Sequence, residues 1–224
     1  NVTMPHKQAV MPLLDRLDLV ATRVGAVNTI IRHESGELSG TNTDVAGFLE
    51  PLQPLLAQAH LFRMARVFGA GGAARAIVAA LASSNFAIVL AARDPAKAQA
   101  LLDELGRGAD NHAVALAHFA PSTDFAFDDR EGVLDLVINA SPLGMAGQEP
   151  LALDFSHVPP GAVIYDIVTH PLDTPLLATA RERGFAAIDG LAMLIGQAAA
   201  AFEKFFGLPA PRQFDAELRV LLTA

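Results

Sequence analysis

The stretch VFGAGGAARA, residues 67–76, decides the fold of this 224-residue chain. It follows a short apolar run over 65–68 and opens a segment rich in Ala, Ile, Val and Leu over 73–83. Glycines at such a point let the backbone turn tightly and let a pyrophosphate approach the free N–H groups at a helix start. The stretch therefore predicts the first strand–helix unit of a dinucleotide-binding fold. The alternative is a glycine-rich turn that only packs helix against strand.

Strands and helices alternate downstream of this turn. Asp94-Pro95 is a strong helix start, a capping carboxylate followed by proline, and Gly106 ends that helix. Because the predicted strands are continuous apolar runs, they fit a parallel sheet covered on both faces. The fold class is therefore α/β, with a doubly wound parallel sheet of the Rossmann type. Further strands are predicted over 86–92, 113–116, 134–139, 162–168 and 185–188, and further helices over 174–184, over 191–202 and after Pro211.

The flanking segments read differently. Ile30 and Ile31 precede a turn that predicts a β-hairpin, and Asp44 is placed to cap a helix that continues to Leu49. Residues 119–132 read as a loop.

Composition excludes several classes of function. Sixteen basic against 24 acidic residues give a net charge of −8, which argues against binding to nucleic acid or to an anionic membrane. The absence of cysteine removes thiolate nucleophiles and cysteine-ligated metals. The seven histidines form no pattern typical of zinc, so we expect no metal. The charge-free run over 76–92 is broken by polar residues, which favours helix, turn and strand over a membrane span.

The residues after the second strand of the glycine-turn unit select the nucleotide. NAD sites place an acid there for the ribose hydroxyls, whereas NADP sites place Arg for the 2′-phosphate. Here Ala92 and Arg93 end the strand, and Lys97 follows one helical turn on. Asp94 stands between them, either as the helix cap or as a ribose ligand that would make NAD plausible. Arg93 and Lys97 could also form an ordinary solvated face.

A second group of polar residues lies outside the nucleotide-binding region. Lys7 is one of only three lysines, and a lysine beside a carboxylate can move a proton to or from a reacting oxygen. Asp44 is the obvious partner, and Thr3 and Asn28 could hydrogen-bond a polyhydroxylated substrate. The plain alternatives are Asp44 as an N-cap and Lys7 as a surface cation.

Seven motifs follow one another along the chain: NVTMPHK, GAVNT, GTNTDVAGF, GAGGAARA, INASPLGM, YDIVTHPLDTPLL and DGLAMLIGQAAAAF. In this order they resemble the shikimate dehydrogenases over nearly the whole chain. The resemblance implies a two-domain α/β enzyme with its site in the interdomain cleft, reducing 3-dehydroshikimate to shikimate with NADPH.

The resemblance also assigns roles to residues. Lys7 would transfer the proton with Asp44 as its partner, and Thr3, Asn28, Asp44, Thr169 and Gln197 would bind substrate. The cofactor would be held by Gly69, Ala70, Gly71, Gly72, Ala73, Ala92, Arg93, Asp94 and Lys97, with Ile167, Gly190 and Met193 at the nicotinamide. The implied domains are an incomplete substrate-binding domain over 1–50, a Rossmann domain over 51–188, and C-terminal helices over 189–224 that return to the first. We expect a cytoplasmic monomer or homodimer.

Three departures from the family pattern keep alternatives open. A Ser-x-x-His-Asn motif that takes the substrate carboxylate is absent, so we read the chain, which starts without Met, as N-terminally incomplete. Thr169 stands where the family usually has Tyr, and Asp94 stands where it usually has Thr. The alternatives are an NAD-dependent quinate/shikimate paralogue and a ligand-sensing homologue without catalysis. Sensing needs no proton shuttle, so the joint presence of Lys7 and Asp44 disfavours the last.

Overall fold

The computed structural model describes residues 1–108, 110–127 and 132–223, and they contain two β-sheets. The strands are β1 (Arg16–Leu17), β2 (Thr29–Arg32), β3 (Leu38–Thr41), β4 (Phe62–Phe68), β5 (Ala87–Ala92), β6 (His112–Ala115), β7 (Val133–Asn139), β8 (Val163–Asp166) and β9 (Ala186–Ile188). The α-helices are α1 (Leu19–Val24), α2 (Asp44–Leu49), α3 (Gln53–Leu56), α4 (Gly72–Ser83), α5 (Pro95–Leu105), α6 (Pro175–Glu182), α7 (Gly190–Phe206) and α8 (Asp215–Thr223). Five short 3₁₀ helices lie at Met11–Leu13, Glu50–Leu52, Leu116–Phe119, Phe155–His157 and Arg212–Phe214.

The larger sheet has six strands, all parallel, in the order β6-β5-β4-β7-β8-β9. Alternate residues of its strands enter two separate cores, one under α4 and α5 and one under α6. Val67 belongs to the first core, for example, and its neighbour Phe68 to the second. Burial on both faces explains why these strands read as continuous apolar runs, and the predicted doubly wound sheet is confirmed.

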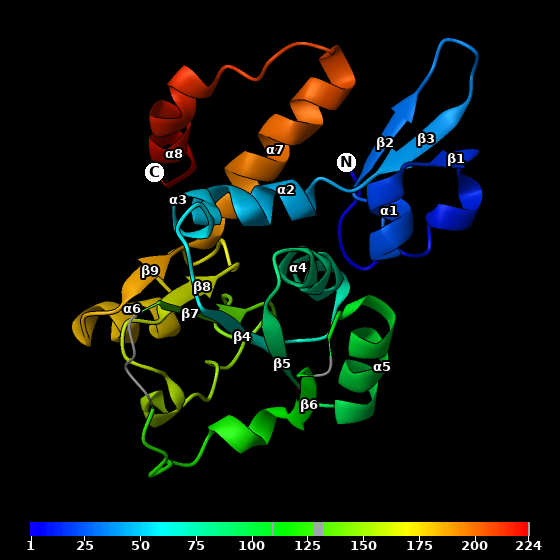
Figure 1. The fold of residues 1–224 in the computed structure, drawn as a ribbon. Coiled ribbons are helices and arrows are strands. Elements are labelled where there is room, and N and C mark those ends of the chain that lie inside the picture. Colours follow the sequence, from blue (N-terminus) through cyan, green and yellow to red (C-terminus); the bar gives the residue numbers. More distant parts are fainter. Residues whose placement is uncertain (109, 128–131, 224) are drawn as a thin grey trace.

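The order of the strands reverses between β4 and β7. Chain connections leave these two neighbouring strands in opposite directions across the sheet, and proteins with such a sheet bind their ligands outside the carboxyl ends of the strands at this point. The glycine turn predicted from residues 67–76 follows β4 directly and lies at this point (Figure 1).

The smaller sheet has three strands in the order β1-β3-β2. Its β2 and β3 form the predicted hairpin, while β1 and α1 were not predicted. Strand β1 has only two residues and helix α1 only six, so neither is long enough to show a periodic pattern of apolar residues in the sequence. Asp18 fixes both, because its Oδ1 accepts from the Ala21 N–H at the start of α1 and its Oδ2 from Thr41 Oγ1, 2.5 Å away.

Helix α7 returns the chain to α2, and the two helices cross in close contact (Figure 1). Glycine makes this crossing possible, since a Cβ on Gly47 would lie 2.6 Å from the Met193 carbonyl oxygen. A Cβ on Gly196 would likewise lie 3.0 Å from the Gly47 Cα. The predicted return of the C-terminal helices is consistent with this crossing, and we keep the domain limits at 50 and 188 as a proposal.

Several predicted details were wrong. The cap of α2 is Thr43, and Asp44 is the first residue of the helix without a capping bond from its side chain. The strand expected over 162–168 ends at Asp166, and the one over 113–116 ends at Ala115, where a 3₁₀ helix begins. Part of the loop expected over 119–132 falls on residues 128–131, outside the described residues. In the part of the chain that the structure describes, no helix is long and apolar enough to cross a membrane.

Candidate active site

The ammonium group of Lys7 and the carboxylate of Asp44 form a close ion pair. Lys7 Nζ donates to Asp44 Oδ2 at 2.6 Å, and the Asp44 side chain is fully buried while that of Lys7 is 15% exposed. A buried carboxylate needs a partner to offset its desolvation, and here it gains one from outside its own helix. Neither plain alternative therefore holds: Asp44 does not cap α2, and Lys7 is not a free surface cation.

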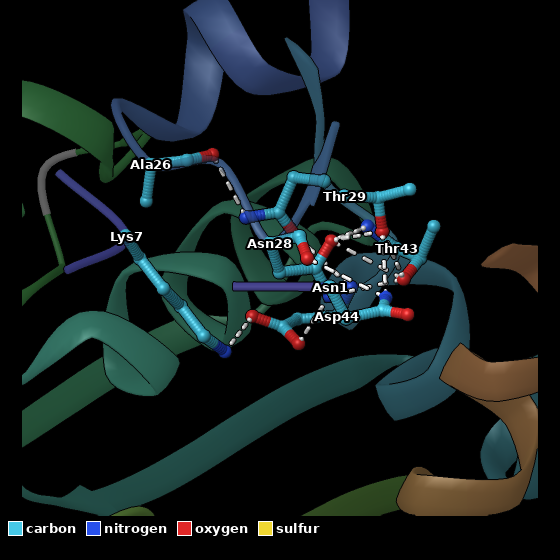
Figure 2. A network of polar contacts seen from close by, with 8 residues as sticks. Asn1, Lys7, Ala26, Asn28, Thr29, Thr43 and Asp44 are labelled. Atoms are coloured by element: carbon cyan, nitrogen blue, oxygen red, sulfur yellow. Dashed lines mark hydrogen bonds and ion pairs between the residues drawn. The ribbon is translucent and has the colours of Figure 1, made fainter. Parts of the chain in front are cut away.

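Asn28 holds the second oxygen of Asp44. Its Nδ2 donates to Asp44 Oδ1 at 2.8 Å, and its Oδ1 accepts from the Thr43 backbone N–H at 2.8 Å (Figure 2). Asn42 adds a further restraint, because its Oδ1 accepts from the Asp44 N–H at 3.0 Å. The carboxylate thus has one oxygen on an amide and one on an ammonium, which fixes the direction in which Lys7 points.

The GAVN segment, residues 25–28, lies directly before β2 and brings the loop of Lys7 close to the start of α2, where Asp44 lies. The Val27 N–H donates to the Lys7 carbonyl oxygen at 2.7 Å, and the Asn28 N–H donates to the Thr41 carbonyl oxygen at 3.1 Å. Two short backbone links therefore hold together the loop with Lys7, the strand β2 and the strand β3 that leads to Asp44. The predicted grouping of Lys7, Asn28 and Asp44 is present in the structure.

The glycine turn lies beside this pair and leaves room for a ligand. Gly69 has φ +117° and packs so closely on the end of β7 that a Cβ would lie 2.8 Å from the Ala140 carbonyl oxygen. A Cβ on Gly71, by contrast, would meet nothing within 4 Å. Gly71 is the N-cap of α4, and no side chain forms a capping hydrogen bond there, so no described side chain occupies the N-cap position. A pyrophosphate fits such a cradle.

Lys7 reaches the same cradle from the other side. A Cβ built on Gly72 would have the Lys7 Cδ as its neighbour, at 3.8 Å. Lys7 therefore lies between its carboxylate partner on α2 and the start of α4.

The residues predicted to read the nucleotide follow β5. Arg93 and Lys97 are exposed, and Ala92 is buried at the strand end. Asp94 is a helix cap: its Oδ1 accepts from the N–H groups of Ala96 and Lys97, at 3.0 and 3.3 Å. Its carboxylate is thus engaged by the start of α5, and the exposed cations beside it are Arg93 and Lys97.

Four predicted residues gather where α7 begins and crosses α2. Gly190 packs directly on the carbonyl groups of Ile167 and Val168, and Met193 is buried in the core that Ile167 borders. Gln197 lies one turn further along α7, against Gly47 of α2. Since Gly47 is one helical turn from Asp44, Gln197 lies on the side of α7 that faces the ion pair.

Two predicted substrate ligands are not brought to the pair by any described interaction. Thr3 and Thr169 are both exposed, and no hydrogen bond links either side chain to Lys7 or Asp44 within the described ranges. The only tyrosine of the chain cannot replace a phenol at position 169. Tyr165 is fully buried, stacks on Phe48 with ring centroids 5.2 Å apart, and burial raises its pKa.

One buried carboxylate at the carboxyl end of β8 was not predicted. Asp166 ends β8 and is fully buried, and its carboxylate accepts from Asn139 Nδ2 at 3.0 Å, Thr174 Oγ1 at 2.7 Å and the Val168 N–H at 3.0 Å. Burial raises the pKa of Asp166, and these three bonds oppose the shift. The carboxylate thereby joins the loops that follow β7 and β8. A signal was present in the sequence, since Asp166 interrupts an apolar strand.

No group of three or more acidic or histidine side chains among the described residues could hold a metal ion.

A doubly wound sheet with a glycine turn at its reversal point defines a dinucleotide-binding α/β protein, and the Lys–Asp pair beside the turn adds the means to move a proton. The comparisons with known proteins narrow this class. The family model for the shikimate dehydrogenase substrate binding domain matches residues 1–30, and that for the shikimate 5′-dehydrogenase C-terminal domain matches residues 190–214. The NADP(+) shikimate dehydrogenase of Sphingopyxis alaskensis is 48% identical over 225 residues, which cover 100% of this chain and 76% of that protein.

Solved structures agree with that relationship. The shikimate 5-dehydrogenase of Thermus thermophilus, in complex with NADP(H) and shikimate, has a TM-score of 0.80 at 33% identity, covering 99% of this chain and 78% of that one. The quinate dehydrogenase of Corynebacterium glutamicum, in complex with NAD, has a TM-score of 0.78 at 33% identity, covering 99% and 77%. The chain belongs to the shikimate dehydrogenase family.

Proposed function

We propose that this chain catalyses the reversible, NADP-dependent interconversion of 3-dehydroshikimate and shikimate, a step of aromatic amino acid biosynthesis. The observation that carries the proposal is the Lys7–Asp44 pair, which lies beside the glycine turn at the carboxyl ends of the parallel strands. The curated relative named above is an NADP(+) shikimate dehydrogenase, and a related structure holds NADP(H) and shikimate. The cytoplasmic location and the monomeric or dimeric state stay part of this proposal.

The residues divide the work of binding. Gly69, Ala70, Gly71, Gly72 and Ala73 offer their backbone to the pyrophosphate, while Ala92, Arg93 and Lys97 lie at the 2′-phosphate, with Asp94 supporting them as a cap. Ile167, Gly190 and Met193 form the wall at the nicotinamide. Asn28, Gln197, Thr3 and Thr169 supply polar atoms toward the substrate hydroxyls.

Lys7 handles the proton. When bound, the dinucleotide supplies the hydride in the reducing direction. Lys7 Nζ then releases a proton to the substrate oxygen as that oxygen gains negative charge, and takes it back in the oxidising direction. Asp44 accepts a hydrogen bond from Lys7 Nζ and holds it in place, and Asn28 holds Asp44. Because Asp44 is buried, solvent screens its negative charge little, and the attraction between Asp44 and Lys7 is stronger than it would be in water.

One alternative rests on a specific observation. Thr169 lacks the phenol that is usual in the family, and the quinate dehydrogenase of C. glutamicum, which was solved with NAD, is nearly as similar in structure. A quinate/shikimate enzyme that uses NAD is therefore the second candidate. The capping role of Asp94 favours the NADP enzyme, because a carboxylate bound to its own helix is a poorer ligand for ribose.

A four-way assay tests both candidates. The full chain is given shikimate or quinate with NADP⁺ or NAD⁺, and the absorbance of the reduced dinucleotide is followed. The proposal expects the highest kcat/KM with shikimate and NADP⁺. A preference for quinate or NAD⁺ supports the alternative, and ligand binding without turnover in any pairing supports the ligand-sensing homologue.

A further inference from the structure

Arg75 joins α4, the helix of the glycine turn, to the end of α1, which lies just before the segment with Asn28. It is the fourth residue of α4, and its N–H donates to the Gly71 carbonyl oxygen at 3.1 Å, which closes the first turn of that helix. Its side chain, 12% exposed, leaves α4 toward α1, and its Nε donates to the Val24 carbonyl oxygen at 2.7 Å. Val24 ends α1, so this bond satisfies a carbonyl that the helix end leaves without an intrahelical partner.

The neighbouring residue is shaped to admit this guanidinium. Gly25 has φ +65° and ends α1 in the left-handed conformation. A Cβ at this position would collide with Arg75 Nη2, and it would lie 3.3 Å from Glu104 Oε1. Glu104 of α5 pairs with the same Nη2 and so holds the guanidinium from its other side. The glycine, the arginine and the glutamate form one interlocking contact among α1, α4 and α5.

The residues that follow Gly25 connect this contact to Lys7 and Asp44 through hydrogen bonds. Beyond Gly25, the Val27 N–H donates to the Lys7 carbonyl oxygen at 2.7 Å, and Asn28 Nδ2 donates to Asp44 at 2.8 Å. A restraint on the Val24 carbonyl therefore acts within four residues on the amide group that holds Asp44. The same arginine belongs to the first turn of α4, directly after the glycine turn.

We propose that Arg75 is a positioning residue that fixes the GAVN segment, which carries Asn28 and hydrogen-bonds the backbone of Lys7, in register with the start of α4, and hence with the dinucleotide. This inference rests on the proposed function for its effect on turnover. It does not require Arg75 to touch substrate or cofactor, because the guanidinium is engaged by Val24 and Glu104. Loss of the Nε bond would free the GAVN segment while the cradle, which is made of backbone, keeps its shape.

Three variants separate this tether from an ordinary structural contact. Arg75→Met removes both guanidinium bonds. Arg75→Lys keeps the charge but can engage Glu104 or the Val24 carbonyl only singly, which guards against a Met variant that does not fold. Glu104→Gln is the matched control, because it removes the charge pair and leaves the Nε bond to Val24 intact.

Turnover is the first readout. Misplacing a reacting group by about 1 Å costs up to about 100-fold in rate, so we expect kcat to fall about 10- to 100-fold in Arg75→Met. The KM for NADP⁺ should change less than about 2-fold, because the cradle and Arg93 are untouched. Glu104→Gln should retain most of the kcat. An Arg75→Met enzyme with unchanged kcat, or a Glu104→Gln enzyme with an equal loss, overturns the proposal.

Hydrogen–deuterium exchange is the second readout and needs no activity. The amides of Val27 and Asn28 should exchange faster in both Arg75 variants than in the wild type and in Glu104→Gln, while those of α4 should not. Equal exchange of the 25–29 segment in all four proteins overturns the tether itself. If the wild type shows no turnover, the proposed function fails, and the exchange pattern still decides whether Arg75 holds the segment.

Discussion

Lys7 Nζ lies 2.6 Å from Asp44 Oδ2, although 37 positions separate the two residues in the chain. Three polypeptide segments meet to produce that distance: the loop at Lys7, the turn before β2 and the start of α2 (Figure 2). The pair lies beside the glycine turn, which follows β4 at the point where the order of the strands reverses. The Lys7–Asp44 ion pair and the glycine turn thus lie next to each other.

Replacing Asp44 by Asn should separate the roles of the pair. The amide cannot offset the charge of Lys7, and its NH2 group would face one of the two donors, Lys7 Nζ or Asn28 Nδ2, so the ammonium loses its fixed direction. We expect kcat to fall by about 10²-fold, at the lower end of the usual range for a proton-transfer group. Steady-state kinetics with Asp173→Asn, an exposed carboxylate on a surface ion pair, provide the control. An unchanged kcat in Asp44→Asn would contradict the role.

Asn28→Ala should cost stability as well as activity. The variant leaves the Thr43 N–H without its partner and Asp44 Oδ1 without its amide donor, both in buried positions. A buried polar group left unpaired costs about 1–3 kcal/mol, so we expect a loss of that size in the free energy of unfolding. Urea denaturation measures it. A loss below about 0.5 kcal/mol would mean that the network does not hold the segment.

Arg93→Ser should change the choice of cofactor. A guanidinium forms charge-assisted bonds with a phosphate, which NAD⁺ lacks at the ribose 2′ position. We expect KM for NADP⁺ to rise about 10-fold or more while KM for NAD⁺ changes little. Arg107→Ser is the control, because Arg107 is also an exposed arginine and follows the C-terminal end of α5. An equal effect on both cofactors would remove Arg93 from the 2′-phosphate site.

Asp94→Ala should act on stability and not on cofactor choice. The variant removes the acceptor for two N–H groups at the start of α5, and loss of such a cap costs about 1 kcal/mol. Thermal unfolding measures the loss, and the ratio of kcat/KM for NADP⁺ and NAD⁺ should stay within about 2-fold of the wild type. A variant that loses activity with NAD⁺ alone would show that Asp94 binds ribose.

Asp166 should give the stability a distinctive dependence on pH. Burial raises its pKa in the folded state, so between the ordinary aspartate pKa and the raised value the folded protein binds more protons than the unfolded one. Stability from this group is therefore full below the ordinary pKa and declines as pH rises through the raised pKa. The difference in unfolding free energy between wild type and Asp166→Asn should fall across that window. A difference that is flat or rises with pH would contradict the raised pKa.

The strands and helices of the large sheet were predictable because their signals are local. Continuous apolar runs, the glycine turn and the Asp94-Pro95 start each act over a few residues, and α5 has the predicted bounds. The nature of the polar residues was also visible, since Lys7 and Asp44 stand in sparsely charged stretches. The resemblance to a known family added the assignment of each residue to a role.

What the sequence could not provide were contacts between distant segments. Nothing local distinguishes an aspartate that caps α2 from one that turns to a lysine 37 positions earlier, and the capping interpretation was wrong for that reason. The bond from Arg75 to Val24 spans 51 positions and depends on a left-handed glycine at 25. Both contacts arise only once distant segments of the chain have packed together.

The most direct test of a proton passing through Lys7 is the turnover of Lys7→Ala with shikimate and NADP⁺, compared with wild type and with Lys204→Ala, an exposed lysine on α7. The account predicts a loss of about 10²- to 10⁴-fold in kcat with little change in either KM, and full activity in Lys204→Ala. A Lys7→Ala enzyme that turns over at near the wild-type rate would contradict it.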